Sequence, residues 1–322
     1  MNTIRWGIIG CGNVTELKSG PAYQKIKGFE VSAVMRRNQE KLLDYATRHR
    51  ITHTFTNATA LIESQYVDAI YIATPPDSHL EYALKVASAG KPCCIEKPMA
   101  PNHDACETII KAFKEKSIPL FAAYYRRSLP RFNQIKEWLD NQEIGVVRSI
   151  HWNLLKPPKQ IDIEQKYQWR TDPDIAPGGY FDDLACHGLD LFSHFFGKVK
   201  AASGYSTNQL KLYGAKDAIV GSWIYQNGIT GTGHWNFGGD RHEDHVRING
   251  SKGTIEFSVF HDKPLKLVND IKEITQSIDN PKHIQIHHVE NIRNALYDKN
   301  FEHPSTGDSA SHTSWIMDQI LK

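Results

Sequence analysis

The chain opens with a short apolar run that ends in a glycine turn. Residues 4–9 predict a buried strand, and Gly10-Cys11-Gly12 follows it directly. The first glycine permits a tight turn, the second lets a phosphate approach the backbone, and the N-terminus of a following helix attracts anions. This order predicts the start of a doubly wound α/β domain that binds a dinucleotide, although Thr15 replaces the third glycine of the usual fingerprint. The alternative is an ordinary strand-to-helix turn. The predicted phosphate-binding residues are Gly10, Gly12, Asn13 and Val14.

The rest of the first third repeats the alternation of strand and helix. The expected strands are residues 30–35, 69–73, 93–95 and 119–122, and the expected helices are 38–49, 78–89 and 101–116. Strands that alternate with helices of this length predict right-handed crossover units and a parallel sheet.

The pattern changes after residue 123. We expect helices at 130–141 and 180–196, a strand at 146–155, an irregular stretch at 156–179, several strands over 199–268 and helix again over 287–322, broken at 304–307. Turn signals at hairpin spacing predict an open, mainly antiparallel sheet. The chain is therefore predicted to be α/β, with a Rossmann domain at 1–123 and an α+β domain at 124–322. Whether the C-terminal helices pack on the first domain is left open at this point.

Composition narrows the classes of function. A net charge of +2 at pH 7 and the absence of a basic run with interleaved aromatics give no reason to expect nucleic acid as a partner. No apolar stretch approaches the roughly 18 residues of a membrane span, and the first ten residues do not resemble a signal peptide. The five cysteines are scattered, which is typical of reduced thiols in a cytoplasmic protein. His242 and His245 are interpreted as part of a charged hairpin loop, and no metal site is expected.

The end of the second predicted strand bears on the identity of the dinucleotide. NAD-binding folds usually place an acid there, which accepts hydrogen bonds from the ribose hydroxyls. This strand ends instead in Arg36-Arg37-Asn38. Guanidinium groups suit a ribose phosphate, so NADP is favoured and NAD stays possible. The alternative is that both arginines are solvated charges at a strand end.

Several short motifs together resemble one enzyme family. They are Gly10-Cys11-Gly12, Thr74-Pro75-Pro76 followed by His79, Glu96-Lys97-Pro98-Met99, Trp169-Arg170, Gly178-Gly179, and Asp183, His187 and Asp190 on one predicted helix. In this order and spacing they resemble the glucose–fructose oxidoreductase, inositol dehydrogenase and MocA (Gfo/Idh/MocA) family over nearly the whole chain. The resemblance implies an NAD(P)-dependent dehydrogenase or reductase for sugars, polyols or related diols, with a C-terminal open sheet that dimerises.

The resemblance also implies roles for residues. The implied catalytic residues are Lys97, Asp183 and His187. Further cofactor-binding residues are expected at Thr74, Pro75, Pro76, His79, Glu96, Lys97, Trp169 and Arg170. Ala185 stands where the family has glycine, and the glycine run before the helix is shortened, which leaves the shape of the substrate pocket open.

The residues themselves agree with those catalytic roles. Asp183 and His187 are four residues apart and so share one face of a helix. A histidine titrates near neutral pH and suits transfer of the hydroxyl proton, while the Lys97 ammonium would stabilise a developing alkoxide. Asp183 is expected to bind a substrate hydroxyl or orient the ring. Tyr125 and Arg127 are further candidates for substrate binding, against the alternative of an aromatic and basic domain junction.

The leading hypothesis is therefore an NADP-dependent oxidoreductase that acts on a sugar or polyol. An NAD-retaining glycosidase and a non-enzymatic dinucleotide sensor are the alternatives. A homodimer or higher homo-oligomer is expected, because residues 219–225 carry large apolar side chains and one helix layer covers only one face of a sheet. The substrate and the physiological direction do not follow from the sequence.

Overall fold

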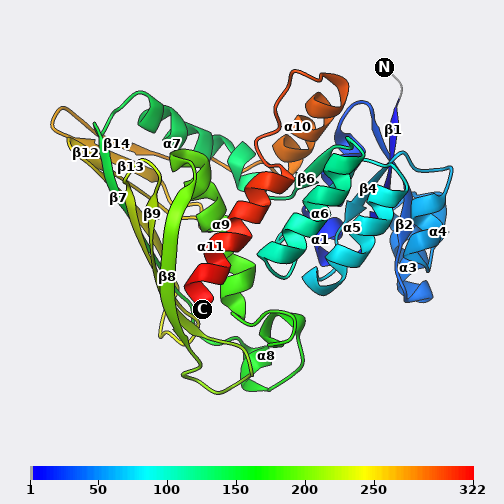
Figure 1. The fold of residues 1–322 in the computed structure, drawn as a ribbon, viewed down its shortest axis with the longest axis horizontal. Helices are drawn as coiled ribbons and strands as arrows, with labels where there is room; N and C mark the ends of the chain where they lie inside the picture. Colours follow the sequence, from blue (N-terminus) through cyan, green and yellow to red (C-terminus); the bar gives the residue numbers. More distant parts are fainter. Residues whose placement is uncertain (1–2) are drawn as a thin grey trace. The chain divides into compact units, whose positions relative to one another are not determined.

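The computed structural model describes residues 3–322, which form two compact units. The first unit runs to Ser128 and takes in Pro281–Ser311, and the second comprises Leu129–Asn280 and His312–Lys322. In Figure 1 the orange helix α10 (Ile286–Tyr297) accordingly belongs with the blue and cyan elements, although it is distant from them in sequence.

The first unit is built on a parallel sheet of six strands in the order β3-β2-β1-β4-β5-β6. The strands are β1 (Ile4–Ile9), β2 (Phe29–Met35), β3 (His53–Phe55), β4 (Ala69–Ile72), β5 (Cys93–Ile95) and β6 (Leu120–Ala122). The strand order reverses between β1 and β4, and folds of this type bind their ligands at the carboxyl ends of the strands on either side of such a reversal. The predicted doubly wound parallel sheet is confirmed.

Short helices connect these strands. They are α1 (Asn13–Leu17), α2 (Gly20–Lys25), α3 (Gln39–His49), α4 (Ala58–Glu63), η1 (Pro76–Ser78), α5 (His79–Ser88), α6 (His103–Glu115) and η2 (Tyr125–Ser128). Asn38 caps the N-terminus of α3, because its side chain accepts a hydrogen bond from the Lys41 N–H at 2.9 Å.

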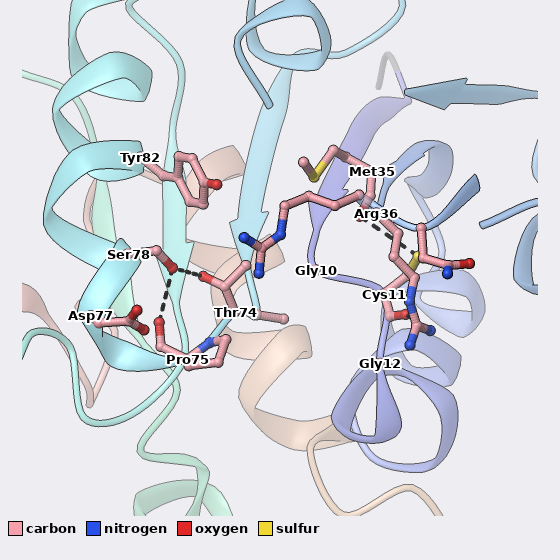
Figure 2. Close-up of a pocket in the computed structure, with 13 residues that line it drawn as sticks. Gly10, Cys11, Gly12, Met35, Arg36, Thr74, Pro75, Asp77, Ser78 and Tyr82 are labelled. Carbon is pink, nitrogen blue, oxygen red and sulfur yellow. Dashed lines mark hydrogen bonds between the residues drawn. The ribbon is translucent and has the colours of Figure 1, made fainter. Parts of the chain in front are cut away.

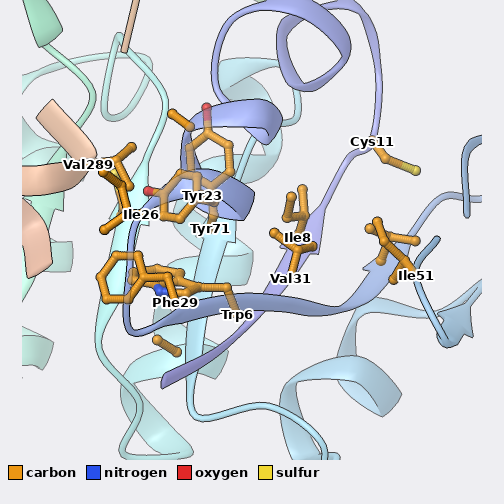
Figure 3. Packing of buried hydrophobic residues seen from close by; sticks show 14 of the residues in the cluster. Trp6, Ile8, Cys11, Tyr23, Ile26, Phe29, Val31, Ile51, Tyr71 and Val289 are labelled. Atoms are coloured by element: carbon orange, nitrogen blue, oxygen red, sulfur yellow. The ribbon is translucent and has the colours of Figure 1, made fainter. Parts of the chain in front are cut away.

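An aromatic cluster fills one side of the first sheet. The ring centroids of Trp6 and Tyr23 are 4.7 Å apart, and those of Tyr23 and Tyr71 are 5.0 Å apart. Figure 3 shows Phe29 against this cluster and Val289, from α10, beside it. Burial of Val289 in the same core ties α10 to the first unit.

The second unit contains a sheet of eight strands in the order β14-β13-β12-β11-β7-β10-β9-β8. The strands are β7 (Val147–Leu155), β8 (Val199–Thr207), β9 (Ala218–Tyr225), β10 (Thr230–Asn236), β11 (Glu243–Gly250), β12 (Gly253–Phe257), β13 (Leu265–Asn269) and β14 (Glu273–Gln276). Neighbouring strands are antiparallel except for the pair β7 and β10. The predicted second, mainly antiparallel sheet is therefore confirmed.

Helices cover one face of this second sheet (Figure 1). They are α7 (Pro130–Asp140), α9 (Tyr180–Phe196) and the C-terminal part of α11 (Gly307–Leu321), while the shorter α8 (Gln160–Ile163) and η3 (Trp169–Thr171) precede α9 in the chain. Helix α9 packs through aromatic rings, with 4.9 Å between the centroids of Phe181 and Trp235 and 5.6 Å between those of Phe192 and Trp152. Because the side of α9 that carries Phe181 and Phe192 packs on the sheet, only the remaining surface of the helix is available for other contacts.

The opposite face of the second sheet is mostly polar. Its exposed apolar side chains include Val220, Ile224 and Tyr205, which are 45%, 38% and 82% exposed, on β9 and β8. On the central strands the same face carries polar side chains such as His151 and Thr232, whose Nδ1 and Oγ1 atoms are 2.7 Å apart. Of the large apolar side chains over residues 219–225, Ile219, Trp223 and Tyr225 are buried on the helix side, and Val220 and Ile224 are exposed on the other face.

The remaining general features concern thiols, metals and membranes. The cysteines at 11, 93, 94, 106 and 186 are buried and form no disulfide bonds. Within residues 3–322, no group of three or more His, Cys, Asp or Glu side chains is arranged to hold a metal ion. In the same part of the chain, none of the helices combines the length and the apolar character that a bilayer span requires.

Candidate cofactor and substrate sites

A pocket of about 420 Å³ lies at the carboxyl ends of β1, β2 and β4, within the usual size range of small-molecule sites. Figure 2 shows two walls, with Gly10, Cys11 and Arg36 on one side and Thr74, Ser78 and Tyr82 on the other. The lining residues are Gly10, Cys11, Gly12, Met35, Arg36, Arg37, Asn38, Ala73, Thr74, Pro75, Asp77, Ser78 and Tyr82. Seven of the predicted cofactor residues are therefore brought together, namely Gly10, Gly12, Arg36, Arg37, Asn38, Thr74 and Pro75.

The two glycines of the turn are needed for different reasons. Gly10 has a φ of +93°, and a Cβ atom there would lie 2.8 Å from the Thr74 Cγ2, so the fold itself demands glycine. Gly12 has an ordinary φ of −126°, and a Cβ atom there would meet nothing closer than the Gly10 oxygen at 4.0 Å. Neither conformation nor packing explains Gly12, so the open space beside it fits a bound pyrophosphate. The observed residues thus fit a dinucleotide.

Arginine side chains occupy the end of β2. The Arg36 Nη1 donates to the Cys11 carbonyl at 2.8 Å, which ties this side chain to the glycine turn. Arg37 lines the same pocket and is exposed. The lining residues that follow β2 include no carboxylate, since the acid of the pocket, Asp77, comes from η1 on the opposite wall.

Sequence reasoning missed three residues of that opposite wall, Asp77, Ser78 and Tyr82. Ser78 and Tyr82 are four residues apart and so project from the same side of the η1–α5 segment. The Ser78 hydroxyl is 2.7 Å from the Thr74 hydroxyl and donates to the Pro75 carbonyl at 3.0 Å. The signal that was available is the four-residue spacing of Ser78 and Tyr82 on the helical segment that follows Thr74-Pro75, which places both side chains toward the pocket.

Two predicted cofactor residues are buried and do not line the pocket. His79 lies with Nε2 2.8 Å from the Thr74 carbonyl and Nδ1 3.0 Å from the Pro98 carbonyl, and burial lowers its pKa. The Glu96 carboxylate accepts hydrogen bonds from the Tyr71 hydroxyl at 2.6 Å and the Gln285 amide at 2.9 Å. These hydrogen bonds hold the loops after β4 and β5 in place, and a direct contact of His79 or Glu96 with the cofactor stays a prediction. Asn13, Val14, Pro76 and Lys97 also lie outside the lining.

The second unit carries the other predicted catalytic residues on α9. Asp183 and His187 lie one turn apart on this helix. The Arg170 Nε donates to the Asp183 Oδ2 at 2.7 Å, and the Arg170 guanidinium lies 4.3 Å from the centroid of the Trp169 ring. Arg170 and Trp169 thus form part of the surroundings of Asp183. The buried His187 ring is 5.8 Å from the Phe260 ring, centroid to centroid.

The predicted substrate residues Tyr125 and Arg127 lie in η2 of the first unit. Both are buried, and the Arg127 Nη1 donates to the Pro304 carbonyl at 2.9 Å. Lys97 also belongs to the first unit, whereas Asp183 and His187 belong to the second. A single catalytic centre made of Lys97, Asp183 and His187 therefore stays a prediction.

Comparison with known proteins identifies both halves of the chain. The model described as "Oxidoreductase family, NAD-binding Rossmann fold" matches residues 4–124, and the "GFO/IDH/MocA C-terminal domain" matches residues 132–256. The chain belongs to the Gfo/Idh/MocA family. It is accordingly an NAD(P)-dependent oxidoreductase that acts on CH–OH groups, as the motifs predicted.

Among Gfo/Idh/MocA relatives, "Oxidoreductase P35" of Formosa agariphila is 38% identical over 317 residues, covering 98% of this chain and 97% of that protein. The "scyllo-inositol 2-dehydrogenase (NADP(+)) IolU" of Bacillus subtilis is 34% identical over 145 residues, covering 45% and 43% of the two chains. A solved levoglucosan dehydrogenase in complex with NADH superposes with a TM-score of 0.86 at 19% identity, covering 99% of this chain and 96% of that one. This last likeness supports the fold alone.

Proposed function

We propose that the chain is an NADP-preferring dehydrogenase or reductase that acts on a hydroxyl group of a sugar or polyol. The observation that carries the cofactor preference is the end of β2, where Arg36 and Arg37 line the pocket beside Gly10 and Gly12. An acid at that position would bind the ribose hydroxyls of NAD and repel the 2′-phosphate of NADP, whereas guanidinium groups bind that phosphate. The relative from Bacillus subtilis that is named an NADP(+) enzyme supports the same choice.

In the proposed chemistry the cofactor carries the hydride, and side chains of the protein handle the proton and the charge on the substrate oxygen. The nicotinamide, when bound, accepts or supplies the hydride. His187 takes the hydroxyl proton of the substrate, or returns it in the reverse direction, because imidazole titrates near neutral pH. The Lys97 ammonium stabilises negative charge on the substrate oxygen. Asp183 holds a second substrate hydroxyl, and its ion pair with Arg170 fixes the direction of its carboxylate.

We further propose a cytoplasmic homodimer. The free, buried cysteines are consistent with a reducing compartment. The exposed Val220, Ile224 and Tyr205 offer an apolar edge from which two sheets can associate through their helix-free faces.

The test is a substrate panel with both cofactors. Sugars, inososes and diols are assayed for absorbance change at the reduced nicotinamide band, and affinities for NADPH and NADH are titrated separately. Turnover with a sugar or polyol and tighter binding of NADPH are expected. Equal affinity for the two cofactors would overturn the preference, and turnover confined to other substrate classes would overturn the substrate assignment.

A further inference from the structure

One face of α9 carries a line of functional side chains within the second unit. Tyr180, Asp183 and His187 are spaced by three and four residues, so they lie along the same face of the helix. Seven residues of α-helix span about 10 Å along the axis. We call these three residues the α9 row. His187 is at one end, Asp183 is in the middle and Tyr180 is at the other end.

A cation accompanies each part of the α9 row. The Lys159 Nζ lies 4.0 Å from the centroid of the Tyr180 ring. The Arg170 Nε donates to Asp183, as described above. The Lys156 Nζ lies 5.8 Å from the centroid of Phe260, the ring that also contacts His187. Lysines from the segment after β7 thus reach both ends of the row.

The nearby carboxylates do not neutralise these lysines. Asp183 is paired with Arg170, and the buried Asp162 accepts from the Tyr180 hydroxyl at 2.9 Å and from the Gln168 amide. Over residues 3–322, no carboxylate oxygen lies within 4.0 Å of the ammonium group of Lys156 or Lys159. Two positive charges beside the row are therefore left without an ion pair.

The local electrostatics support this view for Lys159. Burial lowers the pKa of its ammonium group, Asp183 and Asp162 raise it, and Arg170 and Lys156 lower it. Lys159 is exposed, so an anion in solvent can reach its ammonium group, which lies near Arg170 and Lys156.

We propose that the substrate is an anionic sugar or polyol, whose acidic group binds Lys159 at the Tyr180 end of the α9 row while its reacting hydroxyl meets His187 at the other end. This inference rests on the proposed dehydrogenase function and names its substrate class. The acidic group is a carboxylate, as in a uronic acid, or a phosphate ester, because an ammonium recognises both as a point charge. The length of the α9 row allows one six-carbon molecule to reach from His187 to a lysine.

The first experiment compares matched substrates with the complete enzyme and NADP. The pairs are D-glucose with D-glucuronate and D-galactose with D-galacturonate, and D-glucose 6-phosphate tests the ester. We expect kcat/KM for an acid or for the ester to exceed that for its neutral partner by about tenfold or more. Preference for uronates identifies the carboxylate, and preference for the phosphate identifies the ester. Equal or better use of the neutral sugars overturns the inference while leaving the dehydrogenase function intact.

The second experiment uses variants. Lys159→Gln should reduce the ratio of kcat/KM for the acid to that for the neutral sugar by about tenfold. The matched control is Lys166→Gln, an exposed lysine of the same segment that is paired with Glu164 at 2.6 Å, and it should leave the ratio unchanged. A rise in the Kd of NADPH with an unchanged ratio in Lys159→Gln would assign the lysine to the cofactor and overturn the inference.

A binding measurement separates failure of this inference from failure of the proposed function. Calorimetric titration of D-glucuronate and of D-glucose 6-phosphate into the enzyme loaded with NADPH needs no turnover. Anion binding that is lost in Lys159→Gln supports the inference even if no sugar is oxidised or reduced. Absence of millimolar binding for both anions overturns it.

Discussion

The Arg36 guanidinium donates a hydrogen bond to the Cys11 carbonyl at 2.8 Å and so joins the end of β2 to the glycine turn after β1. Its neighbour Arg37 lines the same pocket but is exposed. The two arginines therefore have different roles. Arg36 shapes the turn that every dinucleotide would use, and Arg37 is the side chain that remains for the 2′-phosphate of the proposed NADP.

The first prediction distinguishes the role of Arg36 from that of Arg37. Arg37→Ala should raise the Kd of NADPH by about tenfold or more, since a charge-assisted hydrogen bond contributes roughly 1.5–3 kcal/mol, and should leave the Kd of NADH nearly unchanged. Arg36→Ala should weaken both cofactors, because the turn loses a support. Fluorescence titration of NADPH and NADH measures both effects. A purely NADP-specific loss in Arg36→Ala would reverse the assignment.

The second prediction concerns the glycine turn. Gly12→Ala should leave the melting temperature within about 2 °C, which corresponds to about 1 kcal/mol or less, because a Cβ there meets no protein atom closer than 4.0 Å. It should nevertheless abolish detectable cofactor binding, since the methyl group takes the space left for the pyrophosphate. Gly10→Ala is the control and should destabilise the fold, given its φ of +93° and the contact with Thr74. Normal cofactor affinity in Gly12→Ala would contradict this reading of the pocket.

The third prediction concerns pH. Burial raises the pKa of Asp182 to about 7, while the Gly178 N–H that donates to its Oδ2 at 2.8 Å opposes the rise. The folded state thus binds a proton that the unfolded chain releases near pH 4, so this group lowers the free energy of unfolding as pH rises from about 4 to 7. Asp182→Asn keeps the acceptor and removes the titration. It should stabilise the protein at pH 8 by on the order of 1 kcal/mol, and by progressively less toward pH 5.

Urea unfolding of the native protein and Asp182→Asn at pH 5 and pH 8 measures this difference. Asp183→Asn is a comparison on the next residue of α9, where the carboxylate is already paired with Arg170. A stabilisation by Asp182→Asn that is as large at pH 5 as at pH 8 would show that the effect does not come from titration.

The fourth prediction concerns assembly. Light scattering at micromolar concentration should give twice the mass of the 36.6 kDa chain. Val220→Glu should lower that mass toward the monomer, because it places a charge on the exposed apolar edge of β9. Leu43→Glu, an exposed apolar position on α3 of the first unit, is the control and should leave the mass unchanged. A monomeric native protein would contradict the proposal.

Long elements could be predicted from the sequence, and short ones could not. Helix α9 begins and ends where predicted because glycine residues flank a long helical pattern, Gly179 before it and Gly197 after it. Strand β3 and helix α4 were missed, since three to six residues carry too little periodicity to identify an element. The grouping of α10 with the first unit depends on contacts such as that of Val289, which no local pattern shows.

The cofactor pocket could be predicted in part. Gly10, Gly12, Arg36 and Arg37 were found because turns and strand ends have a recognisable chemistry. His79 and Glu96 were assigned to the cofactor from the family resemblance, yet both are buried and bonded to protein groups. A motif identifies the residues that a site needs. It does not tell whether a given residue contacts the ligand or supports a loop of the site. That distinction depends on side-chain packing across strands.

The most direct test of the proposed chemistry is single-turnover kinetics of His187→Ala beside the native enzyme, with cofactor affinity titrated separately. A general acid or base typically contributes about 10²–10⁴-fold, so the hydride-transfer rate with an active sugar or polyol should fall by that order while the Kd of NADPH stays within a few-fold. His194→Ala, on the same helix, is the control. A His187→Ala enzyme that transfers hydride at nearly the native rate would contradict the proposed role of His187 and the site built on α9.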